Sequence, residues 1–85
     1  MDQATQVYSP AFDEVFFGLP ASVRAKIEAK IRELGRTLEL YPHHRLQGRR
    51  EYRIRVGDYR VFYTFDLHGN ILYLHEVGHR SEVYR

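Results

Sequence analysis

Residues 52–63 read YRIRVGDYRVFY, and this stretch decides the fold. On both sides of Gly57-Asp58, large apolar residues recur at every second position. Such alternation around a two-residue turn that begins with glycine is typical of a β-hairpin. A two-residue loop also fixes which residues lie opposite each other on the two strands. The stretch therefore predicts a hairpin with a defined register.

The two faces of this predicted hairpin differ chemically. One face carries apolar and aromatic side chains, in the pairs Tyr52–Tyr63, Ile54–Val61 and Val56–Tyr59. The other, which we call the arginine face, carries the pairs Arg53–Phe62 and Arg55–Arg60. Like charges directly opposite each other destabilise a sheet by roughly 0.2–1 kcal/mol. We therefore expect the apolar face to form a core and the three guanidinium groups to converge on an anion.

Helices are predicted before the hairpin. Ser9-Pro10 is a helix start, with serine as the cap and proline at the first helical position. It begins a short helix over 10–17, in which Phe12, Val15 and Phe16 share one side. A second helix is predicted over 20–40, because apolar residues recur there at intervals of three or four. That apolar stripe consists of Val23, Ile27, Ile31, Leu34 and Leu38.

Further strands are predicted at both ends of the chain. Residues 4–8 form a short first strand, with Val7 or Tyr8 as its apolar contribution, and residues 71–77 form a long last strand. In the last strand we expect Leu72 and Leu74 on the core face. The arginine face should then receive Ile71, Tyr73, His75 and Val77. The result is an α+β domain, a small antiparallel sheet of three to four strands with both helices on one face.

Length and composition predict a single small domain over residues 1–85. The chain has no cysteine, which excludes disulfides and thiolate metal sites and favours a cytoplasmic protein. Residues 1–9 contain no apolar run suited to secretion or membrane insertion. His43-His44 and the pair His75 and His79 do not have a spacing that suits metal binding on strands or loops, so we expect neither a metal nor a cofactor.

Positive charge is concentrated in the second half of the chain. Residues 1–44 carry five Lys or Arg against six Asp or Glu, whereas residues 45–85 carry eight against five. Six arginines lie between Arg45 and Arg60, against Glu51 and Asp58. Arginine matches phosphate with two parallel hydrogen bonds and stacks on bases, so this concentration favours a nucleic-acid partner. A solvated basic surface is the alternative.

The hairpin stretch YRIRVGDYRVFY and the ending VGHRSEVY at 77–84 resemble the RelE branch of the RelE/ParE superfamily of bacterial toxins. The resemblance covers residues 46–84. It implies a small antiparallel sheet with helices on one side. It also implies a type II toxin that cleaves mRNA in the ribosomal A site without a metal, inhibits translation and is held inactive by a cognate antitoxin.

The resemblance also assigns site residues. The basic pair of the first hairpin strand falls on Arg53 and Arg55, and the arginine of the next strand on Arg60. The basic residue after the last strand is Arg80, and the C-terminal tyrosine is Tyr84.

Cleavage by attack of a 2′-hydroxyl needs cations for the developing charge and groups that move two protons. Arginines supply the charge but keep their protons. His79 and Tyr84 are the titratable groups expected at the end of the arginine face, so we expect them to handle the protons, with stacking on a base as the second possibility for Tyr84. Structural roles are the alternative for both residues.

RNA contacts are expected beside the catalytic groups. Arg45, Arg49 and Arg50 in the loop before the hairpin are suited to bind phosphates of mRNA or ribosomal RNA, or instead to dock the antitoxin. Phe62 and Tyr73, on the arginine face, are the candidates for stacking on bases.

Two other functions remain open. A ParE-like protein inhibits a DNA topoisomerase by binding it, without catalysis. An inactive protein of the toxin fold could bind RNA or regulate its own expression with a partner. Arg80 and Tyr84 favour the nuclease, since a pure binding module has no chemical need for a cationic cluster beside a titratable tyrosine.

Overall fold

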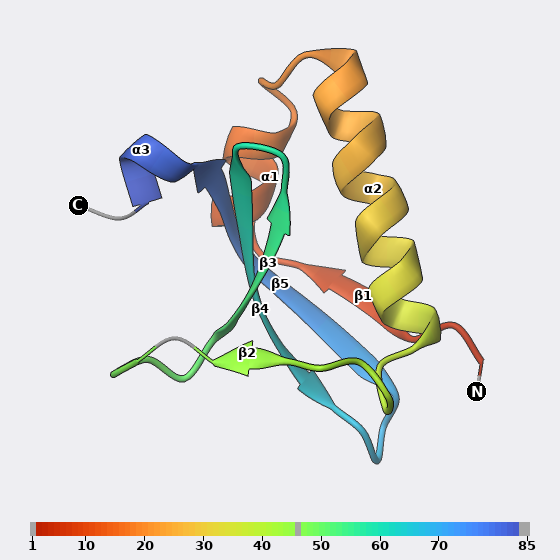
Figure 1. Cartoon of the computed structure of the whole chain (residues 1–85). Helices are drawn as coiled ribbons and strands as arrows, with labels where there is room; N and C mark the ends of the chain where they lie inside the picture. Colours follow the sequence, from red (N-terminus) through yellow and green to blue (C-terminus); the bar gives the residue numbers. More distant parts are fainter. Residues whose placement is uncertain (1, 46, 84–85) are drawn as a thin grey trace.

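One mixed sheet with helices packed on one face makes up the structure (Figure 1). The computed structural model describes residues 2–45 and 47–83. Its elements in chain order are β1 (Thr5–Tyr8), α1 (Pro10–Phe16), α2 (Ala21–Arg36), β2 (His44–Arg45), β3 (Tyr52–Val56), β4 (Tyr59–Asp66), β5 (Ile71–His79) and α3 (Arg80–Val83). The strand order is β1-β5-β4-β3-β2, in which β1 and β5 are parallel and the other neighbours antiparallel. The predicted α+β fold is confirmed, with five strands instead of three to four.

The hairpin of β3 and β4 has the predicted register at every pair. Tyr52 lies opposite Tyr63, Ile54 opposite Val61 and Val56 opposite Tyr59. Arg55 lies opposite Arg60, and Arg53 opposite Phe62. Gly57 has a φ of +61°, a left-handed conformation that glycine adopts without steric cost. The turn therefore fixes the register, as the sequence predicts.

The core lies between the sheet and the two N-terminal helices. Its buried residues are Ala4, Phe12, Phe16, Ile27, Ile31, Leu34, Leu38, Ile54, Val61, Tyr63, Leu72, Leu74 and Val77. Each fully buried Ile or Leu side chain stabilises the fold by about 1.5–3 kcal/mol relative to an exposed one. The stripe predicted on the second helix is confirmed. Val15, however, is exposed on α1. No helix among the described residues has both the length and the apolar character to cross a membrane.

The strand β1 lies at the edge of the sheet and buries a different residue from those predicted. Val7 and Tyr8 are exposed, and Ala4, just before the strand, is buried. The Ala4 N–H donates to the Gly35 carbonyl oxygen at 3.0 Å, which places the start of the strand against α2. A Cβ at Gly35 would collide with the Gln3 side chain. Gly35 therefore allows the close approach of this strand to the helix.

A β-bulge in β5 changes the predicted faces of the last strand. Tyr63 pairs with Leu74 but Phe62 pairs with Glu76, so His75 is an extra residue in β5. Beyond the bulge every side chain changes face. Val77 pairs with Val61 and is only 3% exposed, so its predicted place on the arginine face is wrong.

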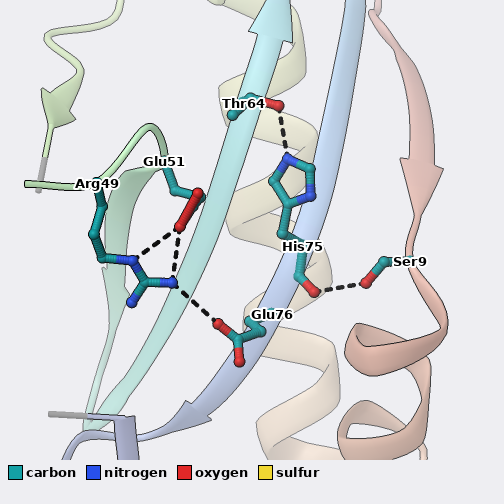
Figure 2. A network of polar contacts seen from close by, with 6 residues as sticks. All are labelled: Ser9, Arg49, Glu51, Thr64, His75 and Glu76. Atoms are coloured by element: carbon teal, nitrogen blue, oxygen red, sulfur yellow. Dashed lines mark hydrogen bonds and ion pairs between the residues drawn. The ribbon is translucent and has the colours of Figure 1, made fainter.

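Ser9 joins this bulge to the start of α1. The Ser9 hydroxyl accepts from the Phe12 N–H at 3.1 Å, as expected of a helix cap. The same hydroxyl donates to the His75 carbonyl oxygen at 2.6 Å, and the Ser9 N–H donates to the Leu74 carbonyl oxygen at 3.0 Å. Figure 2 shows the hydroxyl contact from the chain before α1 to β5. One side chain thus caps a helix and binds the irregular part of the strand.

His43, in the segment that precedes β2, connects the turn after α2 to the sheet. Its Nε2 lies 2.8 Å from the Leu38 carbonyl oxygen, which can only accept, so Nε2 donates. In the neutral ring Nδ1 then accepts from the Tyr63 hydroxyl, at 2.6 Å. Burial raises the pKa of that hydroxyl well above its usual value, so Tyr63 stays protonated and donates. Rings of Tyr52 and Phe65 pack around the imidazole.

We expect Ser9→Ala to lower the free energy of unfolding by about 1–3 kcal/mol, because a helix cap and the hydroxyl bond to the bulge are both lost. Urea denaturation measures the change. Ser9→Asp separates the two roles, since a carboxylate caps α1 but cannot donate to the His75 carbonyl. Equal stability of Ser9→Asp and the wild type would show that the bond to the bulge contributes nothing.

We expect His43→Ala to destabilise the fold by about 1–3 kcal/mol or more, because the buried Tyr63 hydroxyl loses its acceptor. A double-mutant cycle with Tyr63→Phe tests the reason. The coupling energy should lie in the range of about 0.5–3 kcal/mol that contacting side chains show. A coupling energy near zero would contradict the hydrogen bond as the source of the effect.

Candidate functional site

The arginine face consists of cross-strand rows on the side of the sheet away from the core. One row is Arg55, Arg60 and Gly78, on β3, β4 and β5. The next row is Arg53, Phe62 and Glu76 on the same strands. Successive rows on one face of a sheet are about 7 Å apart. The face therefore holds three arginines and one carboxylate within the space of two rows.

The three arginines of these rows differ in their exposure. Arg55 is exposed and Arg53 is half-buried, but Arg60 is only 4% exposed. The Arg60 guanidinium donates from Nη1 to the carbonyl oxygens of Gly57 and Tyr59, at 3.3 and 3.1 Å. The prediction that three guanidinium groups converge on open solvent is therefore wrong for Arg60. Carbonyl groups of the nearby turn hold this side chain against the protein.

Arg53 and Arg55 line a groove of about 340 Å³ at the edge of β3. Its other lining residues are Lys30, Tyr41, His44 and Ile54. Lys30 comes from α2, where it pairs with Glu33 at 3.5 Å. Three of the residues that line the groove are thus basic, which is a composition suited to phosphate. Lys30 and His44 are absent from the predicted site because only the packing of α2 and β2 against β3 brings them to Arg53.

Arg49 occupies the centre of the arginine face (Figure 2). Its guanidinium contacts Glu51 through Nε at 2.9 Å and through Nη2 at 2.8 Å, and it contacts Glu76 through Nη2 at 3.5 Å. The same group lies over the Phe62 ring, with Cζ 5.0 Å from the ring centroid. Phe62 is fully buried, so the prediction of an exposed stacking platform at this residue is wrong. Neither carboxylate was identified from the sequence, since acidic residues were not expected among the arginines.

A second groove, of about 470 Å³, lies at the start of β3, beside the longer β4. It is lined by Arg45, Arg50, Glu51, Tyr52, Thr64, Phe65 and His75. The Arg45 Cζ lies 5.6 Å from the centroid of the Tyr52 ring. Arg50 is exposed. Thr64 Oγ1 and His75 Nε2 are 2.7 Å apart. Arg45 and Arg50, two of the three arginines predicted to bind RNA, therefore line one groove together with polar and aromatic side chains.

Tyr73 keeps its predicted place outside the core. It lies before the bulge, opposite Thr64, and is half-buried. Its ring is stacked near that of His75, with centroids 6.5 Å apart.

His79 lies on the opposite side of the sheet from the arginine face. It pairs with Tyr59, which packs against the core, and the two ring centroids are 5.4 Å apart. Its Nδ1 accepts from the Ser81 N–H at 3.3 Å and lies 2.9 Å from the Ser81 hydroxyl. His79 therefore caps the start of α3, and its predicted place at the end of the arginine face is wrong. The bulge at His75 is the cause, because it reverses the facing of all later residues.

Arg80 begins α3 and is exposed. Its N–H donates to the Asp58 carbonyl oxygen at 2.8 Å, which ties α3 to the turn between β3 and β4. Figure 1 shows α3 and α2 on opposite sides of this end of the sheet. Arg80 is thus anchored near the turn beside Arg55 and Arg60. Tyr84 lies outside the described residues.

No group of three His, Cys, Asp or Glu side chains suited to hold a metal occurs within 2–45 and 47–83.

Similar proteins share this fold. The RelB–RelE antitoxin–toxin complex from Methanococcus jannaschii matches with a TM-score of 0.71 and 26% identity, covering 92% of this chain and 94% of that chain. The intact Escherichia coli RelBE complex matches with a TM-score of 0.76 and 18% identity, covering 89% and 95%. The RelBE2 complex from Mycobacterium tuberculosis matches with a TM-score of 0.77 and 22% identity, covering 96% and 97%. These matches define the chain as a protein of the RelE/ParE toxin fold.

A comparison with models of protein families assigns the chain to one family. The model described as "ParE toxin of type II toxin-antitoxin system, parDE" matches residues 8–84. The chain therefore belongs to this family and is the toxin component of a type II toxin–antitoxin system. A search of curated proteins found no match.

Proposed function

We propose that this toxin is a ribosome-dependent, metal-independent mRNA endonuclease that inhibits translation. The observation that carries the proposal is the groove whose lining includes Arg53, Arg55 and Lys30, with Arg60 directly opposite Arg55. Basic residues around a groove suit a phosphodiester whose negative charge increases during reaction. A binding function alone does not require cations concentrated in this way.

In the proposed reaction the 2′-oxygen of one nucleotide attacks the adjacent phosphorus and loses its proton. The bond from phosphorus to the 5′-oxygen breaks, and the 5′-oxygen gains a proton. The products are a 2′,3′-cyclic phosphate and a 5′-hydroxyl. Arg53, Arg55 and Arg80 stabilise the charge on the phosphoryl oxygens, and buried Arg60 adds positive potential from beneath.

Proton transfer needs groups other than arginines, because a guanidinium keeps its proton at any physiological pH. Tyr84 keeps its predicted role, which is to handle one proton or to stack on a base. His79 faces away from the arginines and caps α3, so the proposed chemistry does not include it.

The remaining arginines are proposed to bind RNA outside the reaction centre. Arg45 and Arg50 line the groove at the start of β3, and the Arg49 guanidinium lies over the Phe62 ring. Contacts from such groups to mRNA or ribosomal RNA phosphates orient a strand without reading its sequence. Tyr73 is the aromatic residue proposed to stack on a base.

A cognate antitoxin is the proposed protein partner. The solved relatives from Methanococcus jannaschii, Escherichia coli and Mycobacterium tuberculosis are complexes of a toxin with its antitoxin. The type II family assignment implies the same kind of partner for this chain.

Non-catalytic inhibition of a DNA topoisomerase is the second candidate function. The observation in its favour is the family model, which is named for ParE toxins. The two candidates share a fold and differ in what the arginine face does.

We expect Arg55→Ala to reduce mRNA cleavage at least about 100-fold, because a charge aimed at the reacting phosphate is lost. Primer extension on a message translated in a cell-free extract measures the cuts. Arg55 is exposed, so the variant should fold normally. Lys26→Ala, an exposed change on α2, is the matched control and should cleave like the wild type. Cleaved plasmid complexes with a purified topoisomerase, without mRNA cuts, would instead support the second candidate.

We expect Arg50→Ala to weaken binding of single-stranded RNA without abolishing cleavage. The RNA carries a 2′-deoxynucleotide at the cleavage site, so that it binds without reacting. The slope of log K against log salt should decrease by about 0.7, the value for one phosphate contact on a single strand. Fluorescence anisotropy at several salt concentrations measures it, and an unchanged slope would exclude Arg50 from phosphate binding.

A further inference from the structure

The proposed reaction leaves open which group removes the 2′-hydroxyl proton. Arginines are unsuitable, and His79 lies on the other side of the sheet. Among the described residues on or beside the arginine face, His44, Glu51, His75 and Glu76 carry side chains able to accept a proton. His44 lies opposite Arg53 on the edge strand β2, whereas Glu76 lies on the central side of Arg53, on β5. Position and exposure distinguish the two carboxylates.

Glu76 lies in the same rows as the arginines. It is directly opposite Phe62, which is directly opposite Arg53. It is also a diagonal neighbour of Arg60, because Arg60 pairs with Gly78, two residues further along β5. Diagonal neighbours on a sheet are about 7–8 Å apart, within reach of long side chains. Arg53 and Glu76 therefore lie on the same face of the sheet, two strands apart, with Phe62 between them.

Glu76 is also the carboxylate that is available to a substrate. Its side chain is 50% exposed, and Arg49 Nη2 lies 3.5 Å from its Oε2. Glu51 is 23% exposed and is held by two Arg49 nitrogens at 2.8 and 2.9 Å. His75 Nε2 lies 2.7 Å from Thr64 Oγ1, in the groove at the start of β3. Figure 2 shows Glu51 and Glu76 on different sides of the Arg49 guanidinium.

We propose that Glu76 is the general base of the cleavage reaction, an inference that rests on the nuclease function proposed above. The ionised carboxylate takes the proton of the 2′-hydroxyl while the 2′-oxygen bonds to phosphorus. The bond to the 5′-oxygen breaks, and that oxygen takes a proton from a water molecule. The resulting hydroxide then receives the proton held by Glu76, which restores the carboxylate.

The charges around Glu76 come from all three central strands. Arg49 and Glu51 face it from the segment at the start of β3, and Arg53 lies in its row. Arg60 lies diagonally on β4, and His75 precedes Glu76 on β5. The cations attract an RNA phosphate to the part of the sheet that carries the carboxylate.

Glu76→Gln should reduce the rate of cleavage about 100- to 10,000-fold, the usual contribution of a general base. The wild-type rate should fall at acid pH as the carboxylate gains a proton, and this fall should be absent in the residual activity of the variant. Glu76→Gln should bind uncleavable RNA at least as tightly as the wild type, since a negative charge is removed. Circular dichroism checks that the variant folds.

Glu51→Gln is the matched control. It weakens the contacts of Arg49 but leaves Glu76 in place, so it should retain cleavage within about tenfold and keep the acid fall in rate. If this control loses as much activity as Glu76→Gln, Glu76 acts by holding Arg49 and the proposal is overturned. The proposal would also be overturned if Glu76→Gln cleaved RNA at the wild-type rate and with the wild-type pH dependence. Absence of cleavage by the wild type overturns the nuclease function itself, which is a separate result.

Discussion

The bulge at His75 is the constraint on which the arrangement of the site depends. A regular β5 would carry Val77 and His79 on the arginine face and would bury Glu76 and Gly78 against the core. The extra residue reverses this order beyond Leu74. The bulge is stabilised from outside the sheet, by the Ser9 hydroxyl that also caps α1. The start of a helix thus contacts a distant strand at the position where the facing of that strand changes.

The structure also explains how so many arginines coexist on one face. Arg60 folds onto two carbonyl groups of the hairpin turn, and Arg49 lies between two carboxylates above the Phe62 ring. Arg55 remains in solvent, where the high dielectric constant weakens repulsion. The face therefore keeps a positive potential without placing unscreened guanidinium groups against each other. A phosphate that enters would meet Arg53 and Arg55 already in one groove.

The fold alone does not choose between the two candidate functions of this family. A RelE-like sheet with two helices is common to the solved relatives, and the family model is named for ParE toxins. Function depends on the groups that the sheet presents. The gathering of Arg53, Arg55 and Lys30, with Glu76 two strands away, is the arrangement that favours phosphodiester chemistry.

Local sequence determined the elements of this protein. The two-residue turn at Gly57 fixed the hairpin register, Ser9 and Pro10 fixed the start of α1, and the apolar stripe on α2 fixed its buried side. These features depend on residues close together in the chain, so their periodicity and capping preferences are visible without a structure. The identities of Arg53, Arg55 and Arg60 on one face follow from the same alternation.

Tertiary structure decided which residues join the arginines. The bulge depends on a contact between Ser9 and His75, 66 residues apart, which no local pattern encodes. Because of the bulge, His79 lies on the core side of the sheet and Glu76 lies on the arginine face. Lys30 reached Arg53 only through the packing of α2, and Arg60 became buried only through the geometry of its own turn. Alternation gives the facing of a regular strand, whereas an extra residue stabilised from another element changes that facing.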